Sequence, residues 1–164
     1  MEVAQIKDLF IAQRGLDETI HKNHGVSYET TRSRRTLALL VEIGELANTT
    51  RCFKYWSNKG SDPKEVVLDE YADGLHFFLS LGICINTKKE EYEITKPDND
   101  LTTQFLKIYE EISIFNNDPS EENYERAFSS FFNLLPLLFY TWDDLKGAYY
   151  KKLGTNYVRQ ETNY

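Results

Sequence analysis

Two pairs of acidic residues, each set inside an apolar run, constrain this chain more than any other feature of its sequence. Glu42 and Glu45 form the first pair, and Glu70 and Asp73 form the second. The members of each pair are three positions apart, which places them on one face of an α-helix, about 60° apart around its axis. Their neighbours are mainly Leu, Val, Ile, Ala and Phe. We therefore expect two helices that each direct a carboxylate pair towards the core.

Such an arrangement needs positive charge. Four carboxylates that converge from two helices repel one another and are costly to desolvate, unless their pKa values rise or cations neutralise them. Oxygen ligands favour a hard cation, and a site with few protein ligands and room for water and phosphate suits Mg²⁺. The alternative is that these carboxylates are solvated at the boundary between helix faces, as most charged residues of amphipathic helices are. Because there are two pairs, we favour a metal site and phosphate chemistry.

The size and charge of the chain narrow its possible partners. With 164 residues, 41% of them hydrophobic, we expect a single domain over residues 1–164. A formal charge of −7 argues against a nucleic-acid polymer as partner, because a phosphate backbone is bound by a basic surface. No signal peptide or membrane-spanning stretch is apparent, and Cys52 and Cys84 have the context of buried thiols without metal-ligand spacing. These features favour a soluble, cytoplasmic protein that does not bind membranes.

Apolar residues recur at helical spacing along most of the chain, and no stretch alternates convincingly with the period of a strand. The expected helices span residues 3–20, 28–53, 63–82, 101–114, 121–140 and 142 to about 154. Asp62 and Pro63 have the character of a helix start, as does Ser120, whereas residues 88–100 resemble an exposed connection. The predicted fold class is all-α, a helical bundle of about five to six helices with the metal site between two facing helices.

The helix expected at residues 121–140 is apolar around much of its circumference. A helix of this kind is more often buried against other helices or a second subunit than left in water. We therefore expect it to form a twofold interface in a homodimer. The residues that give it this character are Phe128, Phe131, Phe132, Leu135, Leu138 and Phe139.

The carboxylate pairs belong to longer motifs that together span nearly the whole chain. These motifs are Gln13-x-x-Leu16-Asp17, Glu42-Ile-Gly-Glu45-Leu-Ala-Asn48, Phe53-Lys-Tyr-Trp56, Glu70-Tyr-Ala-Asp73-Gly-Leu-His76 and Lys152-x-x-x-Asn156-x-x-Arg159-Gln160-x-x-x-Tyr164. They resemble the dimeric dUTPases of the all-α nucleoside triphosphate pyrophosphatase superfamily, which includes members carried by phages of Gram-positive bacteria. The carboxylate pairs alone mark only the superfamily. The Phe-Lys-Tyr-Trp and C-terminal motifs narrow the resemblance to dUTPases.

This resemblance implies an enzyme that hydrolyses dUTP to dUMP and pyrophosphate as a homodimer, in a bacterial or phage-infected host cytosol. It implies that Glu42, Glu45, Glu70 and Asp73 hold Mg²⁺. Metal ions polarise phosphoryl oxygens and activate water, and a carboxylate that is not fully committed to metal can accept the proton of that water. Glu42 and Glu45 are the two candidates for this base.

The resemblance also implies a set of substrate contacts. They are Gln13, Asp17, Asn48, Trp56, His76, Lys152, Asn156, Arg159 and Tyr164. Lys152 and Arg159 are natural countercharges for a polyphosphate, although charges near a chain end are more commonly just solvated. Trp56 is expected either to stack on a base or to anchor the core. Gln13 has an amide that can present a donor and an acceptor to uracil, and Asp17 stands where many relatives have Asn.

The polar segment 152–164 is expected to be a tail that is mobile without nucleotide and closes over the site when nucleotide binds. Two other functions remain open at this point. The protein would be a related pyrophosphatase acting on another nucleotide such as dCTP, or a module that captures a regulatory protein such as a repressor, with nucleotide as a competitor.

Overall fold

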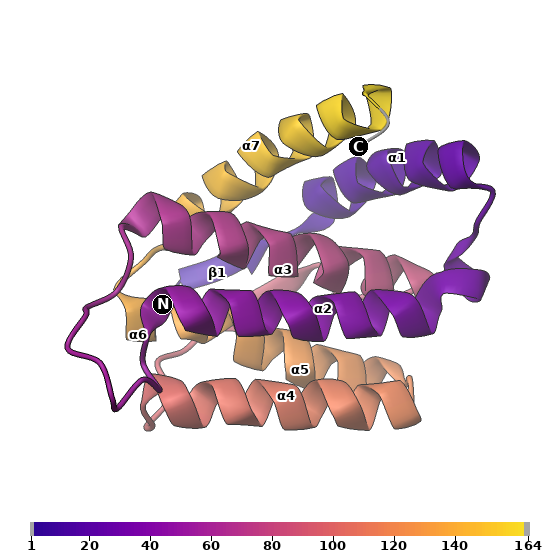
Figure 1. The fold of residues 1–164 in the computed structure, drawn as a ribbon. Coiled ribbons are helices and arrows are strands. Elements are labelled where there is room, and N and C mark those ends of the chain that lie inside the picture. Colours follow the sequence, from indigo (N-terminus) through magenta and orange to yellow (C-terminus); the bar gives the residue numbers. More distant parts are fainter. Residues whose placement is uncertain (1, 163–164) are drawn as a thin grey trace.

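A computed structural model describes residues 2–162, in which seven helices accompany one two-stranded sheet (Figure 1). The elements are β1 (Glu2–Gln5), α1 (Lys7–His24), α2 (Tyr28–Thr50), α3 (Lys64–Cys84), β2 (Glu91–Ile94), α4 (Leu101–Asn117), α5 (Glu121–Phe132), α6 (Leu134–Leu138) and α7 (Trp142–Glu161). The predicted all-α fold class is confirmed. Within the described residues, no helix combines the length and hydrophobicity that crossing a bilayer requires.

Helix α3 is the centre of the bundle. It packs most extensively against α2, while α1 and α7 cover it on one side and α4 and α5 lie on the other side of the α2–α3 pair (Figure 1). Its sequence explains this position, because Tyr71, Ala72 and Leu81 lie on different sides of the helix and all three are almost completely buried. A helix that is apolar around its circumference is stable only when other elements surround it.

The aromatic residues of α5 form the core of this subunit. Phe128 stacks on Phe78 of α3 with ring centroids 4.8 Å apart, and on Phe132 at 4.5 Å. Phe131 is also fully buried, whereas Phe139 is 86% exposed. The prediction that this surface forms a subunit interface is therefore wrong. The apolar side chains of α5 are buried within this chain, where they pack against α3 and the small sheet.

The single helix expected at residues 121–140 is divided. Helix α5 ends at Phe132, and the short α6 follows Asn133. Pro136 accounts for the division, because it has no N–H to donate and its ring would clash with the carbonyl of Phe132 in a continuous helix. Asn133 uses its side chain to accept a hydrogen bond from the backbone N–H of Thr95, 2.9 Å away, which attaches this corner to the end of β2.

The two strands contradict the prediction that the chain has no sheet and that residues 88–100 are merely an exposed connection. β1 pairs with β2 in antiparallel register, with Ala4 opposite Tyr92. Tyr92 is fully buried and Ile94 nearly so, since they face the aromatic core. Because β1 occupies residues 2–5, α1 begins at Lys7 rather than near residue 3. Strands of four residues give too short an alternation to recognise.

Four further expectations concern helix ends and thiols. Ser120 caps α5 as predicted, since its hydroxyl accepts from the N–H of Asn123. Asp62 does not cap α3, because its carboxylate pairs with Arg51 at 2.6 Å. The last helix does not fade at Gly154 but continues to Glu161, so the described part of the expected tail is helical. The two thiols, Cys52 and Cys84, are free and only half-buried.

Candidate active site

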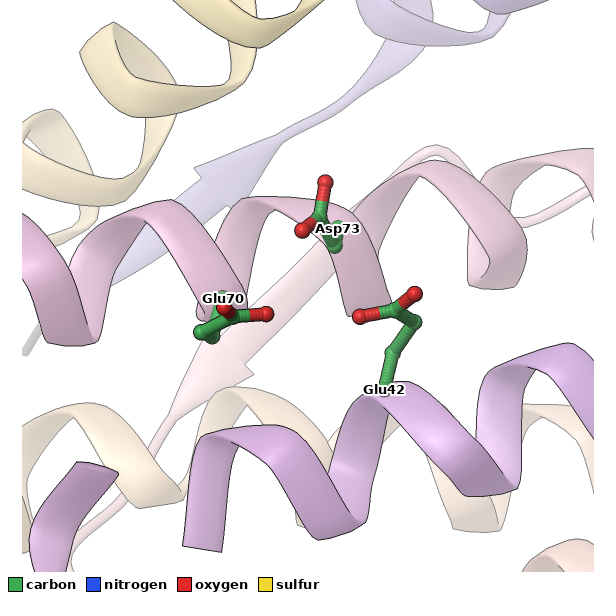
Figure 2. A group of neighbouring side chains, drawn as sticks. All are labelled: Glu42, Glu70 and Asp73. Atoms are coloured by element: carbon green, nitrogen blue, oxygen red, sulfur yellow. The ribbon is translucent and has the colours of Figure 1, made fainter. Parts of the chain in front are cut away.

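Three carboxylates converge between the two central helices. Glu42 extends from α2 towards Glu70 and Asp73 on α3 (Figure 2), and each of them offers an oxygen that lies within 4.8 Å of the others. All three side chains are half-buried. The expectation that this face lies in the core is therefore wrong for the carboxylates themselves, which stand at the rim of the α2–α3 contact. A position at the rim leaves the cluster open to a ligand.

The pKa values of all three carboxyl groups are raised, first by burial. Burial raises the pKa of Glu42 to about 7, with further contributions from the charges of Asp73, Glu70 and Glu45. Burial and the neighbouring carboxylates also raise the pKa of Glu70, and burial raises that of Asp73. A divalent cation would reverse these shifts, because opposite charge favours the ionised form. The oxygen-only donor set fits a hard cation such as Mg²⁺.

Lys152 of α7 places its ammonium group beside this cluster. Its Nζ lies 2.9 Å from Oδ1 of Asp69 and 3.2 Å from Oδ1 of Asp73, and its side chain is almost fully buried. Burial lowers the pKa of Lys152, but the hydrogen bonds and charges of the two aspartates outweigh burial and raise it overall. Sequence analysis missed Asp69. The available signal was its spacing, since positions 69 and 73 share a helix face.

A pocket of about 420 Å³ opens next to the carboxylates and collects residues from α1, α2, α3 and α7. Seven residues singled out from the sequence line it: Gln13, Asp17, Glu42, Asp73, His76, Asn156 and Arg159. Arg34, Arg35 and Ser80 also line it and were missed. Arg35 on α2 donates a hydrogen bond to Ser80 on α3. Arg35 is seven positions from Glu42 on α2, and Ser80 is seven positions from Asp73 on α3. Each separation corresponds to roughly 10 Å along its helix. The pocket therefore extends from the carboxylates over about the length of a nucleoside.

The inner part of the pocket contains a buried carboxylate. Asp17 is 2% exposed and accepts hydrogen bonds from the Gln13 amide at 2.9 Å, the Tyr28 hydroxyl at 2.9 Å and the Ser80 hydroxyl at 2.8 Å. The guanidinium of Arg35 lies 3.7 Å away and supplies the countercharge. A buried carboxylate with three donors and a cation is well compensated. The predicted substrate contact at Asp17 is thus a fully bonded internal acceptor.

Gln13 is committed to internal hydrogen bonds in the same way. Its Nε2 donates to Asp17, while its Oε1 accepts from the Tyr149 hydroxyl at 3.0 Å and pairs with His76 Nδ1 at 2.6 Å. Both ends of the amide expected to meet uracil are therefore in use inside the protein. Nε2 of His76 is the atom of this network that has no hydrogen-bond partner among the described residues.

Several predicted site residues lie away from this pocket. Glu45 and Asn48 are exposed on α2, and Glu45 is outside the three-carboxylate cluster. Trp56 is 64% exposed on the connection between α2 and α3, where it packs edge-on against Tyr55, so its alternative role as a core anchor is wrong. Tyr164 lies outside the described residues.

A comparison with protein families places these observations in context. The family model described as dUTPase matches residues 5–164, nearly the entire chain. A comparison with curated proteins found no match. The matched region contains every element that builds the pocket and the carboxylate cluster. The chain therefore belongs to the all-α dUTPase family and is a dUTP diphosphatase, a hydrolase of nucleoside triphosphates.

Proposed function

We propose that this enzyme hydrolyses dUTP to dUMP and pyrophosphate with Mg²⁺ held by Glu42, Glu45, Glu70 and Asp73. The observation that carries the proposal is the convergence of three of these carboxylates at the mouth of a nucleoside-sized pocket. Glu45 lies one turn along α2 from Glu42 and contributes negative charge to the cluster, as the raised pKa values of Glu42 and Glu70 indicate. A bound Mg²⁺ would polarise the phosphoryl oxygens and acidify a water molecule.

The proton of the attacking water passes to a carboxylate of α2. Glu42 and Glu45 are the two candidates, Glu42 as a member of the tight cluster and Glu45 by its position outside it. The variants Glu42→Gln and Glu45→Gln separate the two. Loss of the base lowers kcat while Mg²⁺ binding persists, whereas loss of a ligand weakens Mg²⁺ binding itself.

The charged face of α7 is the proposed binding surface for the triphosphate. Lys152, Asn156 and Arg159 follow one another at intervals of four and three residues, so they share a helix face, and Asn156 and Arg159 line the pocket. Charge-assisted hydrogen bonds from Lys and Arg are the strongest that a protein offers to phosphate. We propose that the end of the chain to Tyr164 closes over the bound nucleotide, with Asn48 and Trp56 as further contacts.

The proposed homodimer needs a different interface from the one expected from the sequence. Leu37 and Val41 lie one turn apart on α2 and are 63% and 53% exposed, and Leu106 on the adjacent α4 is 66% exposed. We call these three residues the α2–α4 patch. Large apolar side chains that gather on neighbouring helices are typical of subunit interfaces.

The substrate and metal are tested by measuring pyrophosphate release from dUTP, dCTP, dTTP and UTP in Mg²⁺ and in EDTA. The proposal expects Mg²⁺-dependent turnover with the highest kcat/KM for dUTP. A preference for dCTP, or full turnover in EDTA, would overturn the proposal.

A further inference from the structure

The ammonium group of Lys152 is shared between two aspartates of α3 that have different surroundings. Its Nζ lies 2.9 Å from Oδ1 of Asp69, and 3.2 Å and 3.4 Å from Oδ1 and Oδ2 of Asp73. Asp73 belongs to the three-carboxylate cluster and lines the pocket. Asp69 instead lines a separate groove of about 240 Å³ between α3 and α7. Lys152 therefore connects the cluster to a carboxylate that lies outside it.

The side chain of Lys152 has little freedom to leave this position. It is only 7% exposed, whereas the side chain of Asp69 is 54% exposed. An ammonium group has three protons to donate, and a buried one depends on protein acceptors because solvent is excluded. The ammonium can therefore shift its hydrogen bonds from one aspartate to the other more easily than it can exchange both for water.

A metal ion bound at the cluster would compete with Lys152 for Asp73. Both are cations that are attracted to the same carboxylate, and two positive charges close together repel each other. If Asp73 were the only partner of Lys152, the ammonium group would oppose metal binding. Asp69 is four positions before Asp73 on the same face of α3, so it offers the ammonium a second negative charge within reach.

We propose that Asp69 is a positioning residue that prevents Lys152 from blocking Asp73. Asp69 retains the ammonium group when Asp73 becomes a metal ligand, and so keeps it beside the cluster as a partner for phosphate. The inference rests on the proposed function, because it concerns the affinity of the cluster for Mg²⁺. Asp69 contacts neither metal nor substrate in this account. Its influence on the metal site passes through Lys152.

This dependence on Lys152 is tested by a double-mutant cycle on the nucleotide-free protein. Mg²⁺ is titrated calorimetrically into the wild type, Asp69→Asn, Lys152→Met and the double variant. Asp69→Asn should bind Mg²⁺ at least about fivefold more weakly than the wild type, and Lys152→Met at least as tightly as the wild type. In the Lys152→Met background, Asp69→Asn should change the affinity by less than about twofold.

The matched control is Glu65→Gln, because Glu65 is an exposed acid that lies one turn before Asp69 and lines the same groove. It should bind Mg²⁺ as the wild type does. Equal weakening by Asp69→Asn in both backgrounds would show that the charge of Asp69 attracts the metal directly, and would overturn the inference. Unchanged affinity in Asp69→Asn would also overturn it, while leaving the proposed function in place. A wild type that binds no Mg²⁺ would overturn the proposed function and the inference together.

Turnover of dUTP provides a second measurement that separates positioning from a structural role. Asp69→Asn should raise the Mg²⁺ concentration needed for half-maximal activity at least about fivefold. It should leave kcat at saturating Mg²⁺ within about twofold of the wild type, because Lys152 is still present to bind phosphate. A fall in kcat that added Mg²⁺ does not restore would show that Asp69 maintains the packing of α7, and would contradict its role in metal affinity.

Discussion

Nζ of Lys152 on α7 lies 3.2 Å from Oδ1 of Asp73 on α3, so a single ammonium group joins the last helix to the carboxylate cluster. The same group contacts Asp69 at 2.9 Å. Lys152 thus supplies positive charge to a region that otherwise contains several carboxylates with raised pKa values. It is also one of the two cations of the C-terminal motif, the other being Arg159.

Lys152→Met should lower kcat/KM for dUTP by about ten- to a hundredfold, because it removes a charge-assisted phosphate contact and leaves Asp73 without its partner. The matched control is Lys151→Met, since Lys151 is the neighbouring residue but is exposed. Steady-state pyrophosphate release measures both. Equal losses in the two variants would show that general positive charge on α7, rather than this position, is what matters.

Metal-free enzyme should become less stable as the pH rises from about 5 to 8. The carboxyl pKa of Glu42 is raised from 4.5 to about 7 in the folded state, so the folded protein binds more protons than the unfolded chain between these values. The stabilising contribution is complete below pH 4.5 and is lost as the pH passes 7. Urea unfolding in EDTA measures this trend, and Glu42→Gln should reduce it while Glu65→Gln, an exposed control on α3, should not.

Mg²⁺ binding should show the opposite dependence. Protons and Mg²⁺ compete for Glu42, so the apparent affinity should be higher at pH 8 than at pH 6, and binding should release protons. Calorimetric titration in two buffers of different ionisation enthalpy counts those protons. An affinity that is the same at both pH values would exclude Glu42 from the metal site.

The carboxylate pairs could be predicted from the sequence because spacing on a helix fixes which side chains share a face, and α2 and α3 are long enough for that rule to apply. Glu42 and Asp73 accordingly meet. What spacing cannot supply is the depth of a side chain, which is why Glu45 proved exposed and the cluster half-buried. Spacing on one helix also does not identify partners from distant segments of the chain, so the ion pair between Asp69 and Lys152 was missed.

The role of the α5 aromatics shows the same limit. The pattern of Phe128 and its neighbours established that they would be buried but could not distinguish a subunit interface from the core of one chain, because the physical requirement is identical in both cases. The structure gives Phe128 partners in α3 and β2 of its own chain.

Phe128→Ala should therefore lower the free energy of unfolding by about 3–5 kcal/mol, the usual effect of emptying a core aromatic site. Urea denaturation at several protein concentrations provides the measurement. If Phe128 lay at an interface instead, the midpoint of the wild type would depend on protein concentration, and Phe128→Ala would lose that dependence.

Val41→Glu and Leu106→Glu should convert the proposed dimer to monomer, because each puts a charge into the α2–α4 patch. Ile11→Glu is the control, since Ile11 is 63% exposed on α1, away from that patch. Light scattering at micromolar concentration distinguishes the two states. If the wild-type enzyme is a monomer, or if the dimer persists in both charged variants, the α2–α4 patch is not a subunit interface.

The most direct test of the account is a Mg²⁺ titration of pyrophosphate release from dUTP, with wild-type enzyme, Asp73→Asn and the exposed control Asp98→Asn. The account predicts saturable activation by Mg²⁺ in the wild type and Asp98→Asn, and a fall in kcat/KM of at least about a hundredfold in folded Asp73→Asn. Wild-type levels of Mg²⁺-dependent turnover in Asp73→Asn would contradict the central claim that the carboxylates between α2 and α3 are the catalytic metal site.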